Sequence, residues 1–88
     1  MPHTVSYNSF DLENVIFVPV IVTFDTSGHI RPLYVRLDGS SCKVESCWLK
    51  PGFARRYDFM CKIACHDTLV PIVLSYHVDE QVWTIPQS

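Results

Sequence analysis

Charged residues make up only 18% of the 88-residue chain, and glycine occurs three times. Soluble domains average about 25% charged residues, and a hydrophobic content of 48% is not typical of intrinsic disorder. Each glycine falls in a turn signal, which excludes the glycine-rich loop that cradles phosphates. The composition therefore predicts one folded domain of about residues 15–88, without a nucleotide-binding loop.

The chain also lacks a long apolar run and a basic leader. Its longest apolar run, Val15–Val22, is too short to span a bilayer and contains Pro19. No lysine or arginine precedes Arg31, so residues 1–30 resemble neither a secretory signal nor an organelle transit peptide. We expect a cytoplasmic protein with no membrane partner, in which residues 1–14 form a mobile lead.

Four cysteines, Cys42, Cys47, Cys61 and Cys65, raise the question of zinc or disulfides. Neither pair has the two-residue spacing of a zinc knuckle. In a regular strand Cys42 and Cys47 face opposite sides unless the strand bends, and Cys61 and Cys65 share a side about 13 Å apart. A reducing compartment also disfavours disulfides. The expectation is four buried reduced thiols, with no metal and no cofactor.

Turn signals divide the rest of the chain into short apolar segments. Asp25 can bond its own backbone two residues on, Gly28 can adopt a positive φ, and Asp38-Gly39 repeats this hairpin pattern. Pro51-Gly52 suits a type II turn. The predicted fold is all-β, a small antiparallel meander of five to six strands closed as a barrel or folded as a two-layer roll. The predicted strands are 15–24 (starting at Val15 or Pro19), 30–37, 41–49, 57–65, 69–77 and 81–85.

The clearest strand signal is the alternation from residue 57 to residue 65. Tyr57, Phe59, Cys61, Ile63 and Cys65 alternate with more polar or smaller residues, as in a strand with one buried face. In the next strand, Pro71 favours a sheet edge or a bulge, because proline cannot donate to the strand ladder. The pattern predicts that rings and thiols fill the interior.

The turn region also resembles a known family. An apolar residue followed by Phe24-Asp25, Gly28, Ile30 and Pro32-Leu33, and then by Asp38-Gly39 and Val44-Glu45, is similar to small uncharacterised Firmicutes β-proteins. Members are often encoded beside a Y-family translesion DNA polymerase, and the resemblance covers about residues 18–85. It implies a small β protein associated with DNA repair, and it implies no catalytic residue.

No constellation of residues predicts catalysis. Cys65 and His66 are adjacent, so a strand turns them to opposite sides, whereas a nucleophile and its base must meet. His77 is expected at a turn, like His66, and His29 has no evident partner. Asp58 is expected on the outer face, paired with Arg56 or Lys43. We therefore expect a protein that is not an enzyme.

The longest predicted loop holds the best candidate contact surface, formed by Trp48, Lys50, Phe53, Arg55 and Arg56. Cations beside aromatic rings bind single-stranded nucleic acid through phosphate attraction and base stacking, although the net charge of −2 gives no general basic surplus. On the alternative interpretation, which the negative net charge favours, Trp48, Phe53 and Tyr57 belong to the core or cover one end of a barrel, and the cations keep the loop soluble. Two functions stay open: an accessory module that binds an unknown protein partner, and a nucleic-acid-binding barrel associated with repair or replication. Apolar strands also leave a homodimer open.

Overall fold

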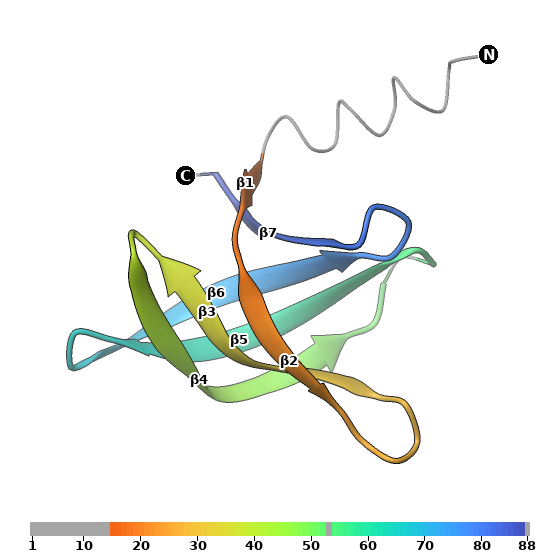
Figure 1. The fold of residues 1–88 in the computed structure, drawn as a ribbon, viewed down its shortest axis with the longest axis horizontal. Coiled ribbons are helices and arrows are strands. Elements are labelled where there is room, and N and C mark those ends of the chain that lie inside the picture. Colours follow the sequence, from red (N-terminus) through yellow and green to blue (C-terminus); the bar gives the residue numbers. More distant parts are fainter. Residues whose placement is uncertain (1–14, 53, 88) are drawn as a thin grey trace.

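The computed structural model describes residues 15–52 and 54–87, and these form one antiparallel sheet of seven strands (Figure 1). The predicted lead at residues 1–14 and Phe53 of the predicted contact surface lie outside the described residues. Among the described residues, no helix has the length and apolarity needed to cross a bilayer. The strands are β1 (Val15–Phe17), β2 (Val20–Phe24), β3 (Ile30–Leu37), β4 (Ser40–Lys50), β5 (Arg56–Cys65), β6 (Thr68–His77) and β7 (Val82–Pro86).

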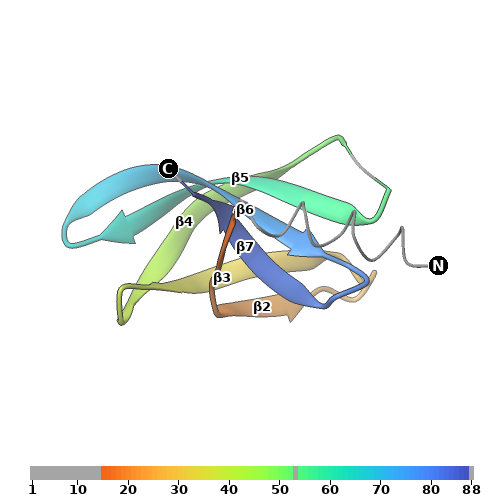
Figure 2. The same ribbon diagram turned by 90° about the horizontal axis from the view of Figure 1, so that it is seen from above.

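The sheet order is β1-β7-β6-β5-β4-β3-β2, so β1 and β2 lie at opposite edges although only Val18 and Pro19 separate them. The sheet curls into a half-barrel, with β2 and β3 opposite β5 and β6 (Figure 2). The two linking residues bond to both sides of the opening: Val18 N donates to the carbonyl of Trp83, and Arg36 N donates to that of Pro19, each at 3.0 Å. The all-β antiparallel meander is confirmed.

The predicted count of five to six strands is wrong, because the first predicted strand is divided at Pro19. Proline has no backbone N–H and restricts the residue before it, so a continuous ladder through this point is disfavoured. The segment before the break pairs with β7, and the segment after it pairs with β3. One predicted strand thus becomes two edges of the same sheet.

The hairpin turns follow the predicted chemistry. Asp25 Oδ1 accepts hydrogen bonds from the backbone N–H groups of Ser27 and His29, both at 2.8 Å, and Gly28 has a φ of 83°. Asp38 and Gly39, with φ of 50° and 80°, join β3 to β4 in the positive-φ geometry of a type I′ turn. The chain reversals at both sites are confirmed.

The predicted type II turn at Pro51-Gly52 is wrong. That turn requires a positive φ at its third residue, and Gly52 does not adopt one. β4 ends at Lys50 and β5 begins at Arg56, and Ala54 and Arg55 just before β5 lie in a turn. The loop is instead tied to the β6–β7 turn, because Val78 N donates to the carbonyl of Arg55 at 3.1 Å.

The core lies on the concave face of the sheet, and the alternation in β5 positions it. Phe59, Cys61 and Ile63 are buried, as predicted, whereas Tyr57 and Cys65 at the strand ends are only partly covered. Pro71 lies in the part of β6 that pairs with β5, outside the β6–β7 ladder, so the predicted edge position is confirmed. The buried hydrophobic residues are Val18, Val35, Cys42, Val44, Phe59, Cys61, Ile63, Leu74 and Trp83.

A bulge in β4 changes which side chains enter this core. Val44 pairs with Ile63 and Ser46 pairs with Lys62, so Glu45 is an extra residue without its own partner. The extra residue shifts the alternation by one, and Cys47 therefore lies on the same concave face as Cys42. The expectation of opposite faces in a regular strand does not hold here, because the strand bends.

Candidate functional site

A cleft of about 890 Å³ lies at the open end of the half-barrel. It exists because β3 pairs with β4 only as far as Lys43, and beyond this point β4 is paired with β5 alone. The cleft is within the range of about 300–1,000 Å³ that is usual for ligand sites. Its lining comes from the β2–β3 hairpin (Thr23, Phe24, Asp25, Gly28, His29, Ile30, Arg31) and from the facing strands (Cys47, Trp48, Leu49, Tyr57, Phe59, Tyr76).

Exposed apolar side chains surround the cleft. Phe24 is 65% exposed, Leu49 53% and Tyr57 40%. The alternation of side chains along each strand nevertheless puts these residues on the side that faces the core. They are exposed because no strand of the described chain closes the barrel at this end. Patches of this kind, when contiguous, mark interaction sites more often than isolated surface residues do.

A group of packed rings connects the cleft to the core. Tyr57 and Tyr76 have centroids 6.5 Å apart, Tyr76 and Trp83 5.1 Å, and Phe59 and Trp83 5.7 Å. These separations lie in or near the favourable range for tilted aromatic pairs. Because Trp83 and Phe59 are buried, they fix the positions of the tyrosines that line the opening.

The charged groups of the cleft come from the β2–β3 hairpin. His29 Nδ1 lies 3.1 Å from Asp25 Oδ2, so the expectation that His29 has no partner is wrong. The backbone N–H of His29 is the main cause of a lowered pKa for the exposed Asp25 carboxyl. Arg31 adds one cation to the same lining. The hairpin thus provides both signs of charge beside an apolar floor.

The structure divides the predicted contact surface. Trp48 lines the cleft and is exposed, but Lys50, Arg55 and Arg56 are not part of the lining. Arg55 donates from Nε to Asp79 Oδ1 at 3.0 Å, and Arg55 is the main cause of a lowered pKa for Asp79. Arg56 is paired with a carboxylate as well, so two of the three predicted cations, Arg55 and Arg56, are neutralised.

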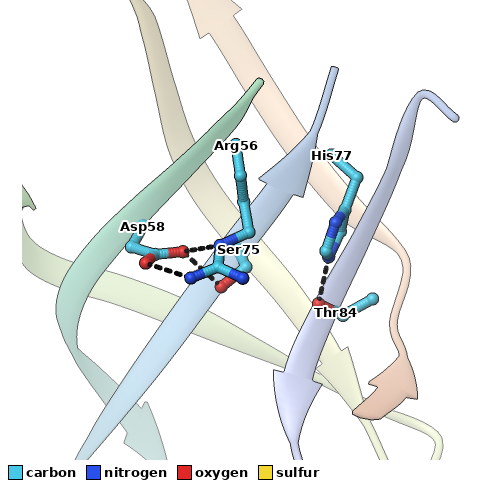
Figure 3. A network of polar contacts seen from close by, with 5 residues as sticks. All are labelled: Arg56, Asp58, Ser75, His77 and Thr84. Carbon is cyan, nitrogen blue, oxygen red and sulfur yellow. Dashed lines mark hydrogen bonds and ion pairs between the residues drawn. The ribbon is translucent and has the colours of Figure 1, made fainter. Parts of the chain in front are cut away.

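Arg56 belongs to a polar network on the outer face of the sheet (Figure 3). It donates from Nε and a terminal nitrogen to Asp58 at 3.0 and 3.2 Å, which confirms the predicted pairing. Ser75 Oγ donates to the same carboxylate at 2.7 Å. His77 Nε2 lies 2.8 Å from Thr84 Oγ1, and both side chains are buried.

His77 ends β6, as the predicted strand 69–77 has it, and its carbonyl accepts from Gln81 N at 2.8 Å in the turn that follows, while its side chain contacts β7. The sequence reasoning missed Ser75 and Thr84, which pair directly across β6 and β7. Only the strand register brings these residues together. Ser75 donates to Asp58, whereas His77 contacts Thr84.

The outer face also has an apolar row beside this network. Trp48 pairs with Met60 and Met60 pairs with Val73, one from each of three neighbouring strands. Together with Pro71 and Pro86 they line a hollow of about 370 Å³. Trp48 therefore stands at the rim between this row and the cleft.

Among the residues that the structure describes, those that could bind a metal do not gather in one place. Within residues 15–52 and 54–87, no group of three or more histidine, cysteine or acidic side chains has suitable geometry. The cleft is therefore the feature on which a function can be argued. Comparison with known proteins does not indicate a function, because the chain matches no protein-family model, no curated protein and no solved structure.

Proposed function

We propose that this protein is a non-enzymatic interaction module that binds an apolar segment of a partner protein in the cleft. The observation behind the proposal is the concentration of exposed Phe24, Trp48, Leu49 and Tyr57 around one hollow. Burying such a side chain contributes about 1.5–3 kcal/mol, and tryptophan and tyrosine are enriched among the residues that dominate interface energies. A partner covering this group gains most of its affinity there.

The neighbouring sheet edge favours an extended peptide as the bound segment. Among the described strands, β2 has a partner on one side only, and its residues Thr23 and Phe24 line the cleft. A peptide that adds a strand to such an edge obtains main-chain hydrogen bonds, while alternate side chains enter adjacent pockets. Asp25, His29 and Arg31 at the same edge offer polar contacts that set its direction.

Selection of random peptides displayed on phage tests this proposal with a defined probe. Peptides enriched on the wild-type protein are expected to bind Leu49→Ser at least about tenfold more weakly, since about 1.4 kcal/mol corresponds to a factor of ten. Leu69→Ser is the matched control, because Leu69 is similarly exposed, at 58%, but does not line the cleft. Equal binding to both variants, or no enrichment of any peptide, would contradict the proposal.

Single-stranded nucleic acid is a second candidate, favoured by one observation. Trp48 and Tyr57 are exposed beside Arg31 in the same cleft, which combines stacking surfaces with a cation. Stacking on an aromatic ring contributes about 1–3 kcal/mol per base. The resemblance to proteins encoded beside a translesion polymerase agrees with this candidate, whereas the pairing of Arg55 with Asp79 reduces the available positive charge.

Fluorescence anisotropy with a labelled oligothymidylate distinguishes the candidates. The nucleic-acid candidate requires binding that weakens steeply as salt rises, and that weakens further in Trp48→Ala and Arg31→Ala. Absent binding, or binding that does not depend on salt, excludes it and leaves the peptide-binding proposal unaffected.

A further inference from the structure

We propose that Cys47 of β4, which lines the cleft, and Cys61 of β5 form a reversible disulfide. The two residues are direct partners in the antiparallel ladder, and both thiols are free in the structure. They meet because Glu45 is an extra residue in β4; in a regular ladder Ser46 would lie opposite Cys61. The inference is independent of what binds in the cleft.

The kind of antiparallel pair that Cys47 and Cys61 form brings the backbones of β4 and β5 close together at this point. His66 and Asp67 form a two-residue turn with φ of 50° and 67°, and Cys65 pairs with Thr68 next to it. In such hairpins the flanking pair is hydrogen-bonded, so Cys65 directs its backbone groups toward β6. Cys61 lies four residues earlier in the same strand and therefore has the same orientation.

It follows that Cys61 faces Cys47 as a non-hydrogen-bonded pair. The Cα atoms of such pairs are about 4.5 Å apart and their side chains are close, while disulfides span Cα separations of about 4.4–6.8 Å. The bond can therefore form with little movement of the backbone. Cys42 and Cys65 are the next cysteines facing each other along these strands, since Lys43 pairs with Ala64.

Access distinguishes the two pairs of thiols. Cys47 is half-buried and lines the cleft, whereas its partner Cys61 is only 3% exposed. Burial, followed by the neighbouring Cys47, raises the pKa of the Cys61 thiol to about 12. An oxidant therefore meets Cys47 first, and Cys61 is placed to resolve the product. Neither Cys42 nor Cys65 lines the cleft.

The reaction balances with a small-molecule disulfide such as oxidised glutathione as the oxidant. Cys47 loses its proton to solvent, and its thiolate attacks one glutathione sulfur, which breaks the glutathione disulfide and releases one glutathione thiolate. Cys61 then loses its proton and attacks the Cys47 sulfur, displacing the second glutathione thiolate. Two protein thiols are oxidised to one disulfide, and one oxidised glutathione is reduced to two thiols.

The test uses the native wild-type protein treated with oxidised glutathione, quenched with acid, alkylated in denaturant and digested with trypsin. Cleavage after Lys43, Arg56 and Lys62 places each of the four cysteines on a different peptide. The expected product is a cross-linked pair of peptides containing Cys47 and Cys61, removed by dithiothreitol, with a protein mass lower by two hydrogen atoms.

Two variants make the assignment specific. Cys42→Ser/Cys65→Ser retains only the proposed pair and is expected to give the same cross-link, while Cys47→Ser is expected to give none at Cys61. If the double variant does not fold, the wild-type peptide map still decides. Four alkylated thiols, a lasting glutathione adduct at Cys47, or Cys47 linked to Cys42 or Cys65 under native conditions would each overturn the proposal.

Discussion

Replacing Ile63 by alanine tests the assignment of the concave face as the core. Ile63 is fully buried, at 0% exposure, near the end of β5. The substitution removes three carbon atoms, which at about 0.8 kcal/mol each costs about 2.4 kcal/mol of transfer free energy. Incomplete collapse around the cavity brings the expected loss to about 3–4 kcal/mol. A domain of this size has about 4–13 kcal/mol of stability, so the loss is a large fraction of the total.

Urea denaturation followed by tryptophan fluorescence measures the effect, because Trp83 lies in the same core cluster. Ile21→Ala is the matched control, since Ile21 is 60% exposed on β2, and a change within about 0.5 kcal/mol is expected for an exposed site. Ile63→Val, with an expected loss of about 1 kcal/mol, replaces the alanine variant if that variant does not fold. Equal losses for Ile63→Ala and Ile21→Ala would refute the inward orientation of the β5 alternation.

Three further predictions concern titration and the polar contacts. Between pH 9 and pH 11 the free energy of unfolding is expected to fall, because the unfolded Cys61 thiol ionises near its ordinary pKa of 9.0 while the folded thiol stays protonated to about pH 12. In this range the unfolded state binds fewer protons than the folded state. Urea titrations are therefore expected to show that the free energy of unfolding of Cys61→Ala falls with pH less steeply than that of the wild type, by about 1.4 kcal/mol per pH unit. Thr84→Val removes the hydroxyl that contacts buried His77 and is expected to cost about 1–3 kcal/mol in the same assay, whereas Thr84→Ser retains the contact. Arg55→Ala is expected to leave the urea midpoint unchanged, because its pair with Asp79 is exposed and screened by solvent, and a clear decrease would assign the loop a structural role.

Local sequence signals predicted most of the fold, because turns and alternation depend on neighbouring residues. The strand predicted at 30–37 coincides with β3, and the four strands predicted after it differ from β4 to β7 by one residue at one or both ends. The turn predicted at Asp38-Gly39 is confirmed, because a two-residue hairpin turn requires residues that tolerate positive φ, and aspartate and glycine do. The division at Pro19 was missed in the strand count, although the proline itself was recognised as a possible strand start.

The candidate site was harder to predict, because it depends on contacts between strands. Trp48, one of the candidate contact residues, is exposed, but the β2–β3 hairpin that faces it across the cleft comes from a distant part of the sequence. The pairing of Arg55 with Asp79 joins residues from two different loops. The spacing of residues within one segment cannot predict such a contact. The predicted basic surface therefore included the positive charge of Arg55, which Asp79 neutralises in the folded protein.

The bulge at Glu45 explains why periodicity alone could not assign the cysteines and Trp48 to faces. In a regular continuation from Val44, residues 46 and 48 would face the core and Cys47 would face outward. The extra residue reverses this: Cys47 pairs with buried Cys61, and Trp48 pairs with Met60 on the outer face. A single unpaired residue thus brings the two thiols together and leaves the tryptophan at the rim of the cleft. The peptide-binding cleft and the thiol pair are separate proposals about chemistry, but both follow from the register of β4 on β5.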